Sequence, residues 1–136
     1  MKGLYKDGLR EGYWEEYWDN GELEWKGLYK EGKKEGLGRA TYYDGSMYSG
    51  EWKNDLRNGV GRAVFKDGSS YYGDWKDDRR SGRGSYDFVN GDKYVGEFTE
   101  GKMNGEGTFT WADGDKQTGR WLNNQKVETT TIASEE

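Results

Sequence analysis

The side chains of this sequence that could carry out chemistry are almost all carboxylates and aromatic rings, because histidine and cysteine are absent. Those two residue types supply the commonest general base, nucleophile and transition-metal ligands of enzymes. Two of the 26 acidic residues could stand at the spacing that a glycosidase uses, but a repeated surface carboxylate usually serves solubility. We therefore expect no enzyme activity, no catalytic residue, no metal ion and no cofactor.

Two short motifs resemble parts of ligand-binding loops. Repeated Gly-x-Gly pairs can cradle a phosphate at a strand-to-helix junction, and the sequence predicts no helix to provide one. The motif Asp113-x-Asp115 is too short for a calcium loop, whose remaining ligands are missing. Neither motif predicts a ligand site.

Aromatic rings give the sequence a second kind of chemistry, which is recognition. Tryptophan, tyrosine and phenylalanine make up 16% of the residues in a chain that is only 31% hydrophobic. Exposed aromatic patches usually mark a binding surface, so we expect part of these rings to line a groove. The alternative is that the rings pack on each other as the core. The predicted groove residues are Tyr48, Trp52, Phe65, Tyr71, Trp75, Phe88, Tyr94 and Phe98, with Phe109 and Trp111 on the same face.

These rings belong to a repeated unit. A Gly-x-Gly pair returns every 23 residues, and Asp-Gly or Asn-Gly pairs and Gly-x-aromatic triplets keep the same period. A fixed period of this kind means tandem copies of one structural unit, so function must be sought in the whole array. The pairs are Gly36/Gly38, Gly59/Gly61, Gly82/Gly84 and Gly105/Gly107.

Each unit is predicted to be two short β-strands and two turns, which makes the chain all-β. Residues 47–52 alternate so that Tyr48, Gly50 and Trp52 share one face, and residues 59–65 alternate again. Residues 53–58 are predicted to form the longer turn, and Asp67-Gly68 the tight one. The glycines are expected to leave room for neighbouring rings, since glycine in a strand often marks a close approach.

Charge is expected to differ between the two edges of such a sheet. The turns predicted to be longer carry a net positive charge and the shorter ones a net negative charge, although each edge is itself a mixture. The difference in charge between the two edges could orient a charged partner. Candidate contacts with that partner are Arg57, Arg79 and Arg80. A net charge of −5 without a basic stripe argues against nucleic acid.

The pattern Tyr48-x-Gly50-x-Trp52, Asn58-Gly59-x-Gly61 and Asp67-Gly68-x-x-Tyr71 resembles the MORN repeat, the membrane occupation and recognition nexus motif. The resemblance runs from Gly27 to Trp121. It departs from the family where histidine often precedes the Gly-x-Gly pair; here those positions are Glu35, Asn58, Ser81 and Asn104. The resemblance implies an elongated, twisted, single-layer antiparallel sheet of tandem hairpins, with a groove along one side and no catalytic activity.

One domain of residues 1–136 is predicted, with distinct ends. Residues 1–26 form a variant first unit, offset by a 24-residue step, and residues 27–121 hold the regular units. Residues 122–132 are predicted to be a polar capping strand and residues 133–136 a frayed tail.

The resemblance implies a non-enzymatic scaffold that binds a peptide or helix of another protein in the aromatic groove, with homodimerisation as an option. The stretch Gly3–Gly32 resembles the variant repeat of bacterial proteins labelled as antitoxin components, so a toxin-neutralising or immunity role is an alternative. An anionic phospholipid adaptor is a further one, weakened because basic residues in the turns have acidic neighbours. Binding of a cell-wall sugar or of choline is another alternative. We expect a cytoplasmic protein, since cysteine, a membrane span and a signal peptide are absent.

Overall fold

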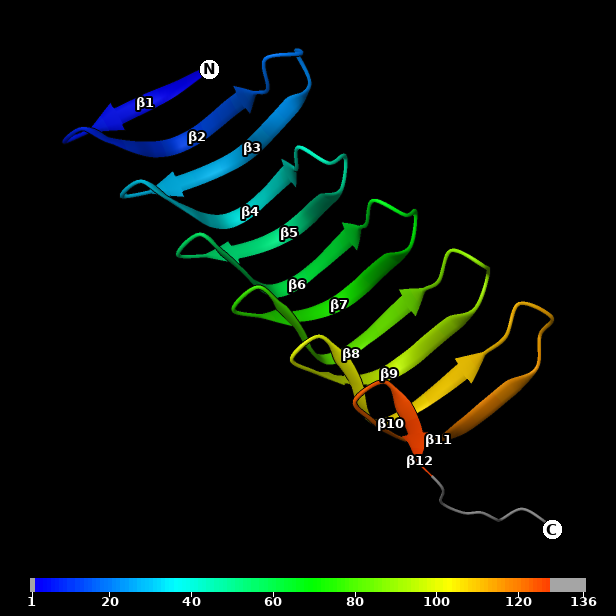
Figure 1. The fold of residues 1–136 in the computed structure, drawn as a ribbon. Coiled ribbons are helices and arrows are strands. Elements are labelled where there is room, and N and C mark those ends of the chain that lie inside the picture. Colours follow the sequence, from blue (N-terminus) through cyan, green and yellow to red (C-terminus); the bar gives the residue numbers. More distant parts are fainter. Residues whose placement is uncertain (1, 128–136) are drawn as a thin grey trace, which may run out of the picture.

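The computed structural model describes residues 2–127, and within that range the chain is all-β, as predicted. Twelve strands lie in sequence order in one antiparallel sheet (Figure 1). Across residues 2–127 there is no helix long and apolar enough to cross a membrane. The strands are β1 (Lys2–Lys6), β2 (Leu9–Tyr17), β3 (Leu23–Lys30), β4 (Lys33–Thr41), β5 (Met47–Lys53), β6 (Leu56–Val64), β7 (Ser70–Lys76), β8 (Arg79–Asp87), β9 (Lys93–Thr99), β10 (Lys102–Thr110), β11 (Lys116–Leu122) and β12 (Gln125–Val127).

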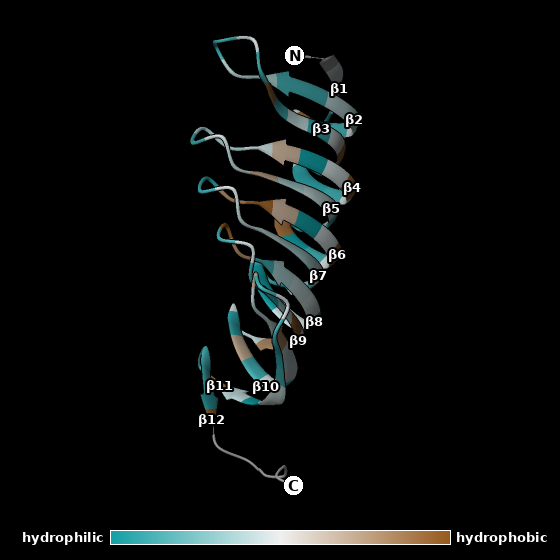
Figure 2. Ribbon diagram, turned by 90° about the vertical axis from the view of Figure 1, so that its right-hand side faces the viewer, coloured by the Kyte–Doolittle hydropathy of each residue, from teal (hydrophilic) through white to brown (hydrophobic). Residues whose placement is uncertain are grey.

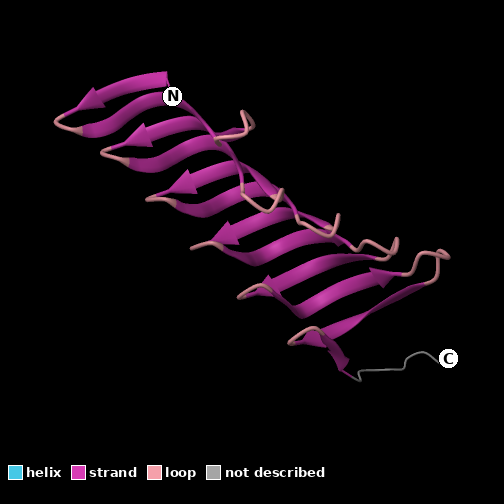
Figure 3. Ribbon diagram, turned by 45° about the horizontal axis from the view of Figure 1, so that its top comes forward, coloured by secondary structure: helices cyan, strands magenta, loops and turns pink. Residues whose placement is uncertain are grey.

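The sheet is a single elongated layer. Successive hairpins follow one another in a row, with β1 and β12 at opposite ends and turns along both long edges (Figure 3). The strands turn gradually along the row, and Figure 2 shows β12 running at a steep angle to β1. In the same figure no strand is uniformly hydrophobic. Successive side chains of each strand must therefore alternate between an apolar face and a solvent-exposed face.

The two kinds of turn are the reverse of what the sequence predicted. Only Asn54-Asp55 joins β5 to β6, and their φ angles of 50° and 69° give a type I′ hairpin. A five-residue loop, 65–69, joins β6 to β7. Asn and Asp tolerate the left-handed region, so two residues close the turn that was predicted to be long. In the other loop, the carboxylate of Asp67 instead accepts a hydrogen bond from the backbone of Ser69 at 2.9 Å.

One face of the sheet carries the core, and we call it the aromatic face. The ring of Tyr48 lies edge-on to Trp52 in its own strand and to Trp75 in the next unit, with centroids 5.1 and 5.2 Å apart. Tyr71 repeats this arrangement with Trp75 and Phe98 at 5.3 and 5.0 Å. Edge-on pairs of this kind each add about 0.5–1.5 kcal/mol beyond area burial. The rings therefore hold each unit to the next.

The second glycine of each pair makes room for a ring, as predicted. A Cβ on Gly61 would fall on the hydroxyl of Tyr48, and a Cβ on Gly50 would fall on the Cα of Gly61. The first glycine has a different role, and there the prediction was wrong. Gly59 has a φ of 90° where the register between β5 and β6 shifts, and its neighbour is the carboxylate of Glu51. A positive φ, and not ring clearance, requires glycine at this position.

At the end of the sheet, β12 pairs with β11 through Arg120 and Val127 and through Leu122 and Gln125. A capping strand was predicted over residues 122–132. Its start was wrong, because Leu122 ends β11, Asn123-Asn124 form a tight turn, and β12 begins at Gln125. The rest of that segment, residues 128–132, and the predicted frayed tail, 133–136, lie outside the described residues.

Because the core tyrosines are buried, the stability of the fold is expected to fall at alkaline pH. Burial raises the pKa of Tyr94 from 10.0 to about 12, and its hydroxyl donates to the backbone oxygen of Glu97 at 3.0 Å. Burial also raises the pKa of Tyr48 and Tyr71. The unfolded chain releases these protons first, so the stability from the neutral ring is complete below pH 10 and is lost as the pH rises toward 12.

We expect the Tyr94→Phe variant to lose stability less steeply than the wild type between pH 10 and 12. The difference in slope is about 1.4 kcal/mol per pH unit, which corresponds to one proton. Urea unfolding followed by circular dichroism at several alkaline pH values measures it. Equal slopes in the two proteins would show that Tyr94 ionises as readily in the folded chain as in the unfolded one.

Candidate functional site

The structure divides the eight predicted groove residues into two groups. Six of them are at most 6% exposed and form the core of the aromatic face: Tyr48, Trp52, Tyr71, Trp75, Tyr94 and Phe98. The expectation that these rings line an open groove is wrong for Tyr48, Tyr71, Trp75 and Tyr94, because each is covered by rings of adjacent units. Phe98 and Trp52 are buried to the same degree, but each borders one of two cavities on the aromatic face. Phe65 and Phe88 are only partly buried and pack against the core from the side of the five-residue loops. Whether any of the eight binds a partner stays a prediction.

Accessible rings gather where the five-residue loops begin. The first residue of every such loop is aromatic, and Trp111, the last of them, is 39% exposed. Phe65, Phe88 and Trp111 were predicted to lie on the aromatic face, whereas Trp18 and Tyr42 were missed. Tyr42 precedes Phe65 by the 23-residue period, and Trp18 precedes Tyr42 by the 24-residue step of the first unit. The full row is Trp18, Tyr42, Phe65, Phe88 and Trp111.

One position in each of four successive repeats places a cation over the rings. The Cζ of Arg57 is 4.5 Å from the ring centroid of Trp75, and the Cζ of Arg80 is 5.1 Å from that of Tyr86. Such cation–π contacts contribute about 0.5–2 kcal/mol each. At the next equivalent position the chain has Met103, which is buried. The four cations are Arg10, Lys34, Arg57 and Arg80.

The three arginines predicted as edge contacts therefore do not share one environment. Arg57 and Arg80 lie over the aromatic face, whereas Arg79 is exposed at the edge, with its Nη1 3.8 Å from Glu100. Arg57 also forms an ion pair with Asp78, with 3.1 Å between Nε and Oδ1. A role in partner binding remains a prediction for all three.

An ion pair between a partly exposed arginine and a buried glutamate marks the first unit. Nε of Arg10 lies 2.7 Å from Glu16, whose other carboxylate oxygen accepts a hydrogen bond from the hydroxyl of Tyr29 at 2.6 Å. Burial, followed by this hydrogen bond, raises the pKa of Tyr29. The next two units have Ala40 and Ala63 in place of Glu16, and the two units after them have Tyr86 and Phe109. The first unit therefore packs differently on the aromatic face.

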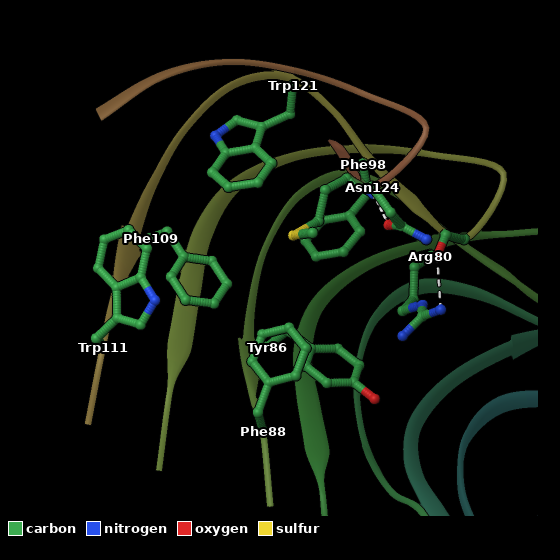
Figure 4. A pocket seen from close by; sticks show the side chains of 10 residues that line it. Arg80, Tyr86, Phe88, Phe98, Phe109, Trp111, Trp121 and Asn124 are labelled. Carbon is green, nitrogen blue, oxygen red and sulfur yellow. Dashed lines mark hydrogen bonds between the residues drawn. The ribbon is translucent and has the colours of Figure 1, made fainter. Parts of the chain in front are cut away.

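A cavity of about 470 Å³ opens on the aromatic face over strands β8 to β11 and the turn that follows β11. Figure 4 shows the strands bending around its side chains, with Trp121, Phe109, Phe88 and Tyr86 on its border and Arg80 on one side. Its lining is largely aromatic and includes one cation. The lining residues are Arg80, Tyr86, Phe88, Phe98, Gly101, Met103, Phe109, Trp111, Trp121 and Asn124.

Polar groups in the cavity are few. Oδ1 of Asn124 accepts a hydrogen bond from the backbone of Met103 at 2.8 Å, and Nη2 of Arg80 donates to the backbone oxygen of Gly101. The indole nitrogen of Trp121 is buried and has no hydrogen-bond partner. In residues 2–127 no three acidic side chains come together in a way that would hold a metal ion. Apolar rings, one guanidinium and one amide suit the recognition of a ligand.

A smaller cavity of about 280 Å³ lies on the same face near the first repeats. It is also bordered by aromatic rings, among them Trp18 and Trp52, but its lining includes the carboxylates of Glu24, Asp55 and Asp78. The two cavities therefore differ in charge as well as in size.

The family model of the MORN repeat matches the chain five times in succession. The matched residues are 2–22, 25–47, 48–70, 71–93 and 94–116, which together span most of the described sheet. The first match lies within residues 1–26, which were predicted to be a variant unit. A search of curated proteins finds no match to this chain.

Proposed function

The chain belongs to the MORN repeat family, and from that premise we propose that it is a non-enzymatic scaffold that holds a segment of another protein on its aromatic face. MORN repeats are in general non-catalytic modules that mediate interactions with proteins or membranes. The observation that carries the proposal is the aromatic cavity over the last repeats, where Phe88, Phe109 and Trp111 border an open space of about 470 Å³.

The cavity has the composition of a protein-binding hot spot. Tryptophan, tyrosine and arginine are the residues most enriched where protein interfaces gain their binding energy. A space of about 470 Å³ can take a few side chains of a peptide or of one helix face. No second layer of the described chain covers this face of the single sheet. A partner segment supplies that missing layer.

Other roles have less support. The described basic side chains often lie beside carboxylates, as in Arg83–Glu97 and Arg120–Glu106, which weakens the case for an anionic phospholipid surface. Flotation with acidic liposomes tests that role directly. An antitoxin or immunity role, a homodimer and a cytoplasmic location stay predictions from the sequence.

The proposal predicts that Trp111→Ala weakens peptide binding by about tenfold or more, as expected when an aromatic anchor is removed. A display library of random peptides selected on the wild-type protein supplies the ligands. Their Kd values are then measured on both proteins by fluorescence anisotropy.

The matched control is Leu37→Ala, which removes a side chain that is 69% exposed on the opposite face of the sheet. We expect this variant to bind the selected peptides as the wild type does. Peptides that bind the Trp111→Ala protein as tightly as the wild type, or a selection that enriches none, would contradict the proposal.

A further inference from the structure

The guanidinium of Arg80 lacks a carboxylate that its counterpart one repeat earlier has. Arg57 pairs with Asp78, which follows it by 21 residues in the next tight turn. The residue 21 positions after Arg80 is Gly101, which offers only its backbone oxygen. Within residues 2–127 no carboxylate forms an ion pair with Arg80. The described chain therefore leaves this cation without a counter-charge.

The missing carboxylate is a difference of sequence and not of backbone. Gly101 has a φ of 83°, close to the 72° of Asp78 and the 69° of Asp55 at the same turn position. A Cβ built on Gly101 would lie 3.6 Å from Nη2 of Arg80, which is ordinary contact. An aspartate would therefore fit there as Asp78 fits beside Arg57. Its absence leaves space next to the guanidinium.

That space is part of the cavity over the last repeats. Arg80 and Gly101 both line it, and its ten lining residues include one cation and no anion. The smaller cavity near the first repeats instead contains Asp55 and Asp78 beside Lys34 and Arg57. The cavity near the first repeats thus contains carboxylates of the chain beside its cations, whereas the cavity over the last repeats contains a cation and no carboxylate.

We propose that the cavity binds an acidic side chain of the partner segment, with its carboxylate on the guanidinium of Arg80. An adjacent apolar side chain of the same segment packs against Phe88, Phe109 and Trp111. This inference rests on the proposed function and names the chemistry of the segment that the scaffold holds.

The environment of Arg80 favours the binding of an acidic side chain. A guanidinium offers five N–H donors in a planar fork that matches a carboxylate, and within the described chain Arg80 donates one hydrogen bond, to the backbone oxygen of Gly101. Arg80 is held over the rings of Tyr86, Phe65 and Phe98 at 5.1 to 5.8 Å, so little side-chain freedom is lost on binding. Aromatic walls reduce the access of water and salt to the pair, which strengthens it.

Two terminally blocked tetrapeptides test the inference on the full chain. They are identical except that one carries glutamate and the other glutamine after a phenylalanine. We expect the glutamate peptide to bind the wild type about tenfold more tightly, because a hydrogen bond to a charged group is stronger than one to a neutral group. Titrations followed by the chemical shifts of ¹⁵N-labelled protein give both dissociation constants.

Two variants at one position make the test specific. In Gly101→Asp the chain supplies the missing carboxylate, so the preference for glutamate should disappear. Gly101→Asn is the matched control of equal size without charge, and Asn124 already occupies the equivalent position in the last turn. This variant should keep the preference, and circular dichroism checks that both variants fold.

Several results would overturn the inference. These are equal affinity of the two peptides, no binding of either, or a preference for glutamate that survives in Gly101→Asp. A third probe, 3-phenylpropionate, separates a partner segment from a free small carboxylate, and binding as tight as that of the glutamate peptide would assign the site to the small molecule. If peptides selected from the display library still depend on Trp111, the proposed function stands even when this inference fails.

Discussion

The Trp75→Ala variant is expected to lose about 3–5 kcal/mol of unfolding free energy, as for other buried tryptophans replaced by alanine. Trp75 is 5% exposed, and its ring contacts Tyr48 and Tyr71 edge-on at 5.2 and 5.3 Å. Arg57 lies over the same ring, and the indole nitrogen donates to the backbone oxygen of Gly61 at 3.1 Å. Alanine removes all of these contacts together and leaves a gap between two units.

Urea unfolding followed by circular dichroism measures this loss, and Trp111→Ala is its matched control. Trp111 is 39% exposed and contacts Phe109 at one side, so its removal is expected to cost about 1 kcal/mol or less. Equal losses of unfolding free energy in the two variants would show that the edge-on rings of the aromatic face are not the core of the sheet. The same reasoning excludes Trp52→Ala and Trp75→Ala as clean probes of binding, because both would weaken the fold.

The Gly50→Ala variant is expected to lose about 3 kcal/mol of unfolding free energy, near the upper end of the usual cost of overpacking. A Cβ on Gly50 would meet the Cα of Gly61 and the backbone oxygen of Val60, 2.6 Å away, in the neighbouring strand. These atoms belong to paired backbone and cannot turn aside as a side chain can. The strands β5 and β6 must separate to admit even one methyl group.

Gly45→Ala separates this effect from the effect of losing a glycine. Gly45 has open space around its Cβ position and a φ of 95°, so alanine costs only the left-handed backbone, about 1 kcal/mol. Chemical unfolding midpoints of the two variants against the wild type give the comparison. A Gly50→Ala protein as stable as Gly45→Ala would contradict the packing described for the aromatic face.

Periodicity alone predicted the strands and their two faces. Because side chains alternate along a strand, the positions of Tyr48, Gly50 and Trp52 were enough to assign them to one face. The turns were harder to predict, since Asn54-Asp55 closes a tight hairpin without glycine. Asn and Asp each tolerate a positive φ, but Asp67-Gly68 is the stronger hairpin signal in the sequence, and the structure places it in the five-residue loop.

Exposure and the cavity could not be predicted from the pattern. Whether Tyr48 is buried depends on the rings that reach it from Trp52 and Trp75, and the latter belongs to the following unit. The sequence did contain the signal for the missing anion beside Arg80, which is the change from Asp78 to Gly101 at one position of the repeat. That signal gains meaning only when the register of the sheet places each of these residues beside an arginine.

The indole N–H spectrum of the ¹⁵N-labelled protein, recorded with and without a selected peptide, tests the proposed binding surface most directly. Single Trp→Phe variants assign the resonances. We expect the signals of Trp111 and Trp121 to move on binding and those of Trp52 and Trp75 to stay in place, because of these four only Trp111 and Trp121 line the cavity over the last repeats. Movement confined to the other tryptophans, or no movement when the peptide is bound, would contradict it.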